Sequence, residues 1–298
     1  MTTYILGVDG GGTKTIARLV NTDTGQSWQC LGGPSSLSLG VDSAVKTIVQ
    51  QGSELARQAG IALSDISLLC GLAGSSEQSL CLAAQHALQA SFYQVEICSD
   101  AKTSAWGANH GQPVAVVALG TGSVAMTLSN QGIETLIGGW GLLVGDEGSG
   151  ARFGLHAINT MLWEMDSGQE LSATGRLLSE QVGYERSDIL SWLRAAKSTD
   201  FAALLPAIWP WQSRCPVAQA LVQQHLQAVV RIIQTLDPKL PLMLIGGLAA
   251  LTAPLLPAHI QQRLQPALGD ALDGACLLAR HLFVPISSDA RVGFARQA

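Results

Sequence analysis

The chain has 298 residues, of which 47% are hydrophobic and 13% charged, and its formal net charge is -5. This composition is typical of globular rather than disordered proteins, and the length fits two domains that each bury a core, or one large domain. The basic residues are scattered along the chain, so the positive patch that nucleic-acid binding requires is missing. We therefore expect no nucleic-acid partner.

The sequence carries no sign of export, metal clusters or membrane insertion. The six cysteines lack CxxC or Cys/His spacing, which argues against zinc and iron–sulfur sites and fits buried residues in a reducing cytoplasm. The N-terminus lacks the basic and apolar regions of a signal peptide. The run 240–258 is apolar enough for a membrane helix, but Gly246, Gly247, Pro254 and Pro257 interrupt it. We expect a cytoplasmic protein without membrane segments.

The first part of the chain predicts antiparallel strands followed by alternating helices and strands. Short apolar runs bounded by turn residues predict three strands, at 4–8, 15–20 and 27–31. A helical stripe covers 41–59 and ends at Gly60. Next come, in order, a strand at 66–73, a helix at 77–92, a strand at 94–98 and a helix from 101. This alternation is typical of a mainly parallel sheet.

The second part repeats the opening pattern. Apolar residues 113–119 lead into the turn 120–123 and a returning strand at 124–128, so we infer two related halves with a boundary near residue 112. The later segments are a glycine-rich loop at 138–154, a helical insertion at 155–236 whose last helix begins at Pro216, a strand at 241–245 and helices to about 281. The fold class is therefore α/β, with domains 1–112 and 113–283.

Two glycine-rich turns, at 7–15 and 120–123, could each bind phosphate through backbone N–H groups. The first is not a P-loop, because Thr13 stands where that motif needs lysine. Asp9 beside it could hold magnesium directly or through water. An ordinary hairpin turn would explain the first turn alone, but a second turn of the same kind favours a triphosphate held between two domains. The candidate phosphate-binding residues are Gly11, Gly12, Thr13, Lys14, Gly120, Thr121 and Gly122.

Asp100 is the candidate catalytic carboxylate. It comes directly after a predicted strand, where open α/β sheets place ligand-binding residues. Transfer of a phosphoryl group to a hydroxyl needs a carboxylate that accepts the hydroxyl proton. The alternative is that Asp100 caps the following helix, which its position alone favours.

The loop 138–150 is rich in glycine around a single tryptophan. Trp140 could offer an apolar platform for a sugar ring and Asp146 could accept hydrogen bonds from its hydroxyls, whereas a mobile surface loop would leave the tryptophan unexplained. Gly246 and Gly247, between a strand and a helix, could admit an adenine or ribose close to the backbone. A tight turn explains this pair equally well.

These segments together resemble the N-acetylglucosamine kinase and glucosamine kinase group of the BadF/BadG/BcrA/BcrD ATPase family, within the actin-like ATPase superfamily. The resemblance covers nearly the whole chain and rests on the segments 9–15, 99–101, 120–123, 138–149 and 245–247. It implies a two-domain, ribonuclease H-like fold with a nucleotide cleft between the domains, and residues from about 284 to 298 are expected to complete the N-terminal domain. It also implies Mg-ATP and commonly a homodimer.

The resemblance also implies a role for individual residues. Asp100 would be the general base for the 6-hydroxyl of an amino sugar, Gly139, Trp140 and Asp146 would hold the sugar, and Thr13 and Thr121 would face ATP. Gly246 and Gly247 would form the adenosine motif. Ser36 departs from the family, which usually has asparagine at this sugar-binding position.

Two other functions remain open at this point. One is an ATPase that activates another enzyme, which the absence of closely placed cysteines disfavours. The other is a sugar sensor that binds without catalysis, which would not need Asp100 as a base.

Overall fold

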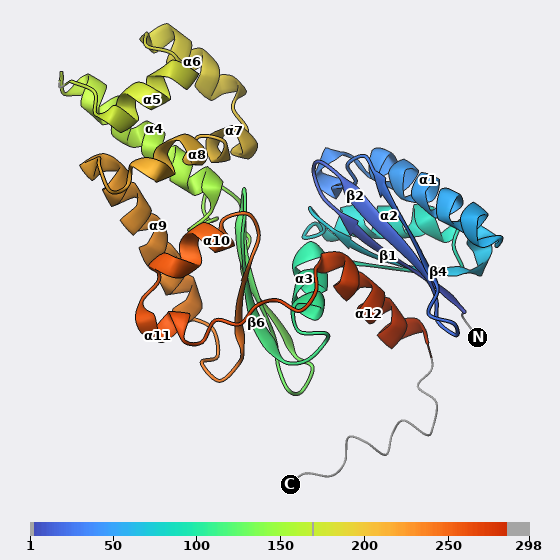
Figure 1. Cartoon of the computed structure of the whole chain (residues 1–298). Coiled ribbons are helices and arrows are strands. Elements are labelled where there is room, and N and C mark those ends of the chain that lie inside the picture. The colour runs from blue at the N-terminus through green and yellow to red at the C-terminus, as the bar shows by residue number, and fades with distance from the viewer. Residues whose placement is uncertain (1–2, 169, 285–298) are drawn as a thin grey trace. The chain divides into compact units, whose positions relative to one another are not determined.

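The structure is a computed structural model that describes residues 3–168 and 170–284 (Figure 1). The described chain divides into two compact units. Unit 1 contains residues 3–114, 128–134 and 267–284, and unit 2 contains 115–127 and 135–266. The sequence predicts a first domain of residues 1–112 and a second of 113–283, whereas residues 267–284 lie in unit 1. The prediction that 284–298 complete the N-terminal domain concerns residues that, apart from Val284, lie outside the described ranges.

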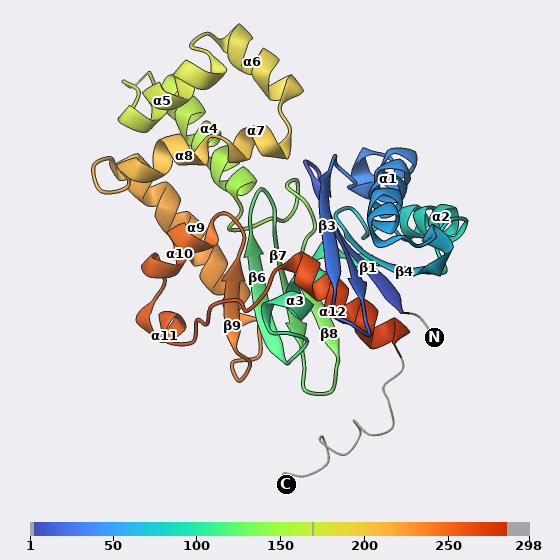
Figure 2. The same ribbon diagram turned by 45° about the vertical axis from the view of Figure 1, so that its right-hand side comes forward.

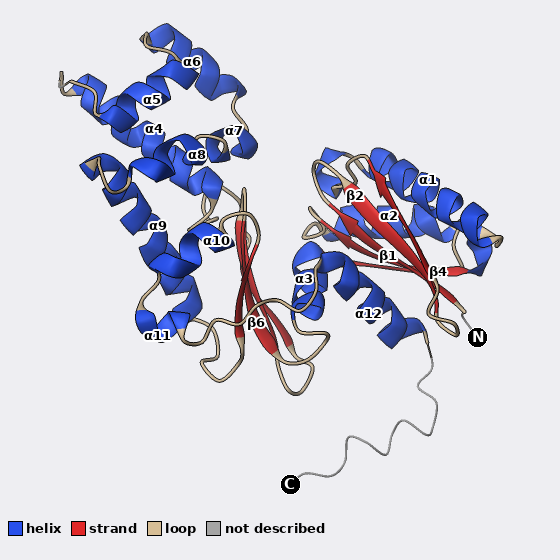
Figure 3. Ribbon diagram, in the orientation of Figure 1, coloured by secondary structure: helices blue, strands red, loops and turns tan. Residues whose placement is uncertain are grey.

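Unit 1 is built on a five-stranded sheet with the order β3-β2-β1-β4-β5 (Figure 3). The strands are β1 (Tyr4–Gly10), β2 (Thr15–Asn21), β3 (Ser27–Gly32), β4 (Ile66–Leu72) and β5 (Gln94–Ser99). The first three pair antiparallel, while β4 runs parallel to both β1 and β5. The carboxyl ends of β1, β4 and β5 therefore meet at one edge of the sheet, where parallel sheets carry their ligand sites.

Helices cover both faces of this sheet (Figure 2). One face is covered by α1 (Val41–Ala59) and α2 (Gln78–Gln89), and the other by α3 (Asp100–Ala108) and α12 (Ala271–Phe283). Side chains alternate accordingly, because Leu6 and Leu68 pack in the core under α1, whereas Ile5 and Leu69 pack against α12. A short 3-10 turn, Leu37–Leu39, lies between β3 and α1, and a second, Leu63–Asp65, lies between α1 and β4.

The helices α3 and α12 touch backbone to backbone. A Cβ atom at Gly107 would lie 1.8 Å from the Asp270 carbonyl oxygen, and one at Gly274 would lie 1.8 Å from the Thr103 carbonyl oxygen. Only glycine fits at either position without displacing the helices. This close approach, together with the packing of α12 on β1 and β4, explains why a segment from the end of the chain belongs to unit 1.

Unit 2 contains a four-stranded sheet with the order β8-β7-β6-β9. Its strands are β6 (Val114–Leu119), β7 (Ser123–Leu128), β8 (Glu134–Gly138) and β9 (Leu242–Ile245). The strand β8 was not predicted from the sequence. The run 240–258 is the parallel strand β9 followed by short helices, as the sequence interpretation expected.

Helices form the remainder of unit 2. They are α4 (Gly150–Asp166), α5 (Ala173–Val182), α6 (Arg186–Ala195), α7 (Ser198–Ala202), α8 (Leu205–Ile208), α9 (Pro216–Gln234), α10 (Ala249–Thr252) and α11 (Ala258–Gln261), with 3-10 turns at Trp209–Trp211 and Ala253–Leu255. Pro216 occupies the first turn of α9, as predicted. Among the described helices, none is long and apolar enough to cross a membrane.

Candidate functional site

The first glycine-rich turn connects β1 to β2 in unit 1. Gly10 pairs with Thr15, and the Gly11 amide donates to the Lys14 carbonyl at 3.0 Å, which closes the turn. The turn residues Gly12, Thr13 and Lys14 are exposed. The Gly11 carbonyl accepts from the amides of Ser35 and Ser36 at 3.1 Å each, so the segment after β3 is attached to the base of the turn.

Asp9 and Asp100 interact electrostatically at the carboxyl edge of this sheet. Burial, followed by the charges of Asp100 and Asp270, raises the pKa of Asp9 to about 6, while Lys14 opposes the shift. Asp270 was not singled out from the sequence. It caps α12, where its Oδ1 accepts from the Asp273 amide at 2.9 Å, and the signal for it was the pair of acids three residues apart before an apolar helix. A cation between these carboxylates and a phosphate would relieve their repulsion.

The cap of α3 is Ser99 and not Asp100. Ser99 Oγ accepts from the Lys102 amide at 3.1 Å, and Asp100 is the first residue of the helix. The capping alternative for Asp100 is therefore wrong. The Asp100 carboxylate accepts from the Ala101 amide at 2.9 Å. The residue is exposed at the surface, but the protein around it removes part of the water from the carboxylate, and this desolvation raises the pKa of Asp100.

Ser36 lies close to this edge but is buried. Its hydroxyl donates to the Ala73 carbonyl at 3.1 Å, directly after β4. The hydroxyl proton is thereby used within the protein, and only the lone pairs of Ser36 Oγ remain for another partner. Ser38, two residues further on, is exposed and lies over Gly74, since a Cβ at Gly74 would come 2.4 Å from Ser38 Oγ.

The second glycine-rich turn, in unit 2, is held by the start of α4. The Gly120 amide donates to the Gly122 carbonyl at 3.0 Å within the turn. The carbonyls of Gly120 and Thr121 accept from the amides of Gly150 and Ala151 at 2.8 and 3.1 Å. The turn is thus tied to the first turn of a helix, and Thr121 itself is exposed.

Asp146 lies beside this second turn. A Cβ at Gly122 would come 3.2 Å from Asp146 Oδ2, and the Ser123 amide points to Asp146 Oδ1 at 3.5 Å. The backbone of Asp146 has φ 59°, in the left-handed region that aspartate tolerates better than most residues. Burial raises the pKa of Asp146, and the Ser123 amide and the Arg152 charge oppose this shift.

The loop between β8 and α4 presents apolar side chains to solvent. Trp140 is 78% exposed, and Leu143 is 95% exposed. Gly139 has φ 73° and Gly141 has φ 82°, so the loop needs glycine on both sides of Trp140. An indole displayed in this way is available to a ligand and contributes little to the core of unit 2.

Gly246 and Gly247 lie next to the end of β6. A Cβ at Gly246 would come 2.4 Å from the Leu119 carbonyl oxygen, and the Leu248 amide donates to that oxygen at 3.0 Å. Gly247 is exposed, and a Cβ added there would meet no other atom within 4 Å. Unit 2 therefore brings together three of the predicted segments, at 120–123, 146 and 246–247, while unit 1 brings together those at 9–14, 36 and 100.

The described residues contain no group of three or more His, Cys, Asp or Glu side chains that could hold a metal ion. A smaller set of ligands is what Mg²⁺ uses when it takes one or two carboxylates together with phosphate and water. The six cysteines are free.

Comparisons with known proteins agree with the motifs. Residues 6–253 match the sequence model of the BadF/BadG/BcrA/BcrD ATPase family. The chain is 27% identical over 286 residues to glucosamine kinase GspK of Vibrio cholerae serotype O1, covering 93% of this chain and 95% of that protein. It is 26% identical over 269 residues to N-acetyl-D-glucosamine kinase of Dictyostelium discoideum, covering 81% and 84% of the two chains.

Solved structures give the same picture. A Chromobacterium violaceum protein provisionally assigned as an N-acetylglucosamine kinase is 33% identical with a TM-score of 0.84, covering 93% of this chain and 98% of that one. A ROK family glucokinase from Streptomyces griseus, 16% identical with a TM-score of 0.50 and covering 93% and 99%, shares the fold. The actin-like ATPase fold predicted from the sequence is confirmed.

Proposed function

Because the chain belongs to the BadF/BadG/BcrA/BcrD ATPase family, we propose that it is an ATP-dependent kinase that phosphorylates an amino sugar, glucosamine or N-acetylglucosamine, at the 6-hydroxyl. The curated relatives that cover most of the chain carry those two activities in their names. The observation in unit 1 that supports the proposal most directly is that Asp100 lies at the carboxyl edge of the sheet and is not the N-cap residue of α3.

Asp100 is the proposed general base. A base is most effective when its pKa approaches the working pH, and desolvation shifts the pKa of Asp100 in that direction. In this proposal the carboxylate accepts the proton of the sugar hydroxyl as that oxygen attacks the terminal phosphorus of ATP. Ser99 leaves it available for this role by capping α3 itself.

The nucleotide is proposed to bind through the backbone of both glycine-rich turns. Gly11, Gly12, Thr13 and Lys14 in unit 1 and Gly120, Thr121 and Gly122 in unit 2 would contact phosphate, and Gly246 and Gly247 would contact adenosine. Asp9 is the proposed magnesium ligand. Magnesium supplies charge neutralisation on the phosphates, and its binding would also lower the cost of ionising Asp9.

The sugar is proposed to bind to Trp140, Gly139 and Asp146. The exposed indole of Trp140 offers a platform for a ring, and the Asp146 carboxylate offers two hydrogen-bond acceptors. Ser36 is proposed as a weaker contact, which could act only through its lone pairs because its proton is used by Ala73. Unlike the asparagine usual in the family, it cannot donate to a sugar oxygen in this conformation.

A coupled assay of ADP release with glucosamine, N-acetylglucosamine and glucose tests the proposal. We expect release to depend on one of the amino sugars and on Mg²⁺. We expect Asp100→Asn to lower kcat about 10²- to 10⁴-fold, the usual contribution of a general base, with little change in sugar binding measured by calorimetry. Asp42→Asn, at an exposed position in the first turn of α1, is the matched control.

The outcomes separate the competing functions. ADP release that ignores every sugar would indicate an ATPase activator, and sugar binding without turnover would indicate a sensor. Unchanged kcat in Asp100→Asn would remove the proposed base. The homodimer that the family resemblance implies, and the cytoplasmic location expected from the cysteines and the N-terminal sequence, stay predictions, to be checked by analytical ultracentrifugation and cell fractionation.

A further inference from the structure

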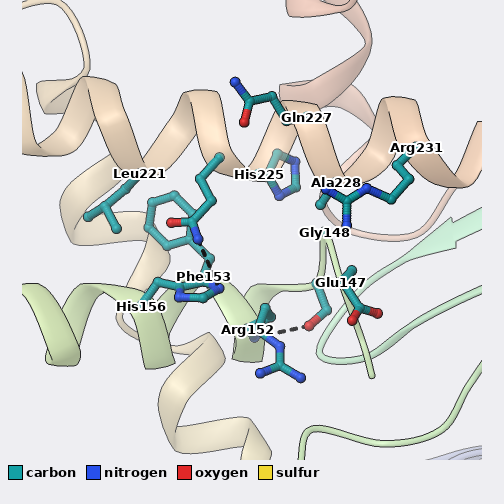
Figure 4. A pocket seen from close by; sticks show the side chains of 12 residues that line it. Glu147, Gly148, Arg152, Phe153, His156, Leu221, His225, Gln227, Ala228 and Arg231 are labelled. Atoms are coloured by element: carbon teal, nitrogen blue, oxygen red, sulfur yellow. Dashed lines mark hydrogen bonds between the residues drawn. The ribbon is translucent and has the colours of Figure 1, made fainter. Parts of the chain in front are cut away.

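A cavity of about 290 Å³ lies between α4 and α9 in unit 2 (Figure 4). At one end His156 of α4 meets Gln224 of α9, with His156 Nε2 and Gln224 Nε2 3.3 Å apart. At the other end lie Arg231 and the turn that contains Glu147 and Gly148. Its volume suits a small metabolite rather than a drug-sized ligand. None of the individual residues proposed above as ATP or sugar ligands lines this cavity, although Glu147, Gly148 and Ser149 belong to the glycine-rich loop 138–150.

Its walls are firmly packed. Phe153 and Leu221 form an apolar side, and the buried His225 also lines the cavity, with its Nε2 2.8 Å from Thr252 Oγ1. The His225 ring also packs edge-on against Trp209, with ring centroids 5.3 Å apart. The side chains that line the cavity are therefore held in place by packing and hydrogen bonds before a ligand binds, which favours selective binding of a small molecule.

The polar lining is electropositive, although the whole chain has a net charge of -5. Arg152 and Arg231 line the cavity against one acidic side chain, Glu147. Within the described residues, no hydrogen bond or ion pair engages the exposed Arg231 guanidinium. The Nε and Nη2 atoms of Arg152 donate to the Gly145 carbonyl, which leaves Nη1 free.

His156 adds a neutral donor to this lining. Burial and the nearby Arg152 charge lower the pKa of His156, so its ring is uncharged at neutral pH. Because the Gln224 amide nitrogen can only donate, His156 Nε2 accepts and Nδ1 carries the proton. The lining thus offers guanidinium and imidazole donors, which match the oxygens of a phosphate or carboxylate.

We propose that this cavity is a binding site for a small organic anion that carries a phosphate or carboxylate group, held chiefly by Arg231 with support from Arg152 and His156. The site is connected to the loop that contains Asp146. Arg152 holds the Gly145 carbonyl, and the Glu147 carbonyl accepts from Ser123 Oγ at 2.7 Å. A ligand bound in the cavity would therefore contact Arg152 and Glu147, which hold the loop segment 145–147 next to the second glycine-rich turn. The inference does not depend on the proposed kinase function.

Calorimetric titration of the full chain with inorganic phosphate and, separately, with citrate tests the site. A non-hydrolysable ATP analogue is present in excess, so that phosphate cannot bind to the nucleotide site. We expect at least one anion to bind, and Arg231→Ala to weaken it about 10- to 100-fold, the contribution of hydrogen bonds to a charged group. Arg231→Lys should recover part of the loss.

Arg214→Ala, at an exposed arginine outside the cavity, should leave the affinity unchanged. Circular dichroism checks that each variant is folded. Binding of phosphate alone would identify a phosphorylated ligand, and binding of citrate alone a carboxylate. The proposal is overturned if neither anion binds, or if Arg231→Ala and Arg214→Ala bind as tightly as the unmodified chain.

Discussion

Replacing His225 by glutamine should remove an acid sensitivity from unit 2. His225 is buried between Phe153 and Trp209, and its Nδ1 atom has no hydrogen-bond partner among the described residues. Desolvation lowers the pKa of His225 from 6.5 to about 4. The folded protein therefore keeps this ring neutral in a range where the unfolded chain would protonate it.

The size of the effect follows from the shift. Between pH 6.5 and about 4 the unfolded state binds more protons, so the stability of unit 2 falls as the pH falls through this window. At 1.36 kcal/mol for each pKa unit, this shift makes the folded state about 3 kcal/mol more stable above pH 6.5 than below about pH 4. Glutamine reaches the same hydroxyl of Thr252 and does not titrate, so the variant should lack this loss.

The assay is hydrogen exchange, measured by mass spectrometry on peptides from α9 between pH 4 and 7.5, with rates corrected for their intrinsic pH dependence. At neutral pH the variant should be less stable by about 1–2 kcal/mol, because glutamine cannot reproduce the ring packing. The two stability curves should then converge or cross as the pH falls. His86→Gln, at an exposed position on α2, is the control. Parallel curves for His225→Gln and the unmodified chain would refute the reasoning.

Two further predictions concern unit 1. Asp9→Asn should stabilise the ligand-free protein above pH 6 by up to about 3 kcal/mol, because the raised pKa of Asp9 makes its ionisation costly in the folded state. The stability of the unmodified chain therefore falls as the pH rises from 3.8 to about 6, so urea unfolding should show a stability difference between the two chains at pH 8 but not at pH 4. The variant should also lose Mg²⁺-dependent ADP release. Gly274→Ala should destabilise unit 1 by about 2–4 kcal/mol, because the new methyl group would overlap the Thr103 carbonyl, whereas Gly247→Ala, with open space around it, should unfold at the same urea concentration as the unmodified chain.

Elements with a strong local signal could be predicted from the sequence. The helix α1 begins and ends where the apolar stripe places it, and Gly60 closes it with φ 71°. Pro216 marks the start of α9. The strands β1, β2 and β4 were found because they are short apolar runs between turns, and their burial in the sheet is what such runs require.

Other features depend on tertiary contacts that a local pattern does not contain. The strand β8 is a half-exposed edge strand, so its residues lack a clear apolar alternation. Two neighbouring residues, Ser99 and Asp100, can both cap a helix, and only the structure shows which one does. The Ser36 hydroxyl donates to the carbonyl of Ala73, a residue far along the chain.

The contact between α12 and the first strands has a consequence during protein synthesis. The helix α12 (Ala271–Phe283) supplies one layer of unit 1, but the ribosome makes it only after the whole of unit 2 has been translated. Until then the face of β1 and β4 that α12 covers lacks its partner and exposes apolar side chains to water. We therefore expect unit 2 to reach its native packing first, and unit 1 to depend on chaperones or on rapid release of the finished chain.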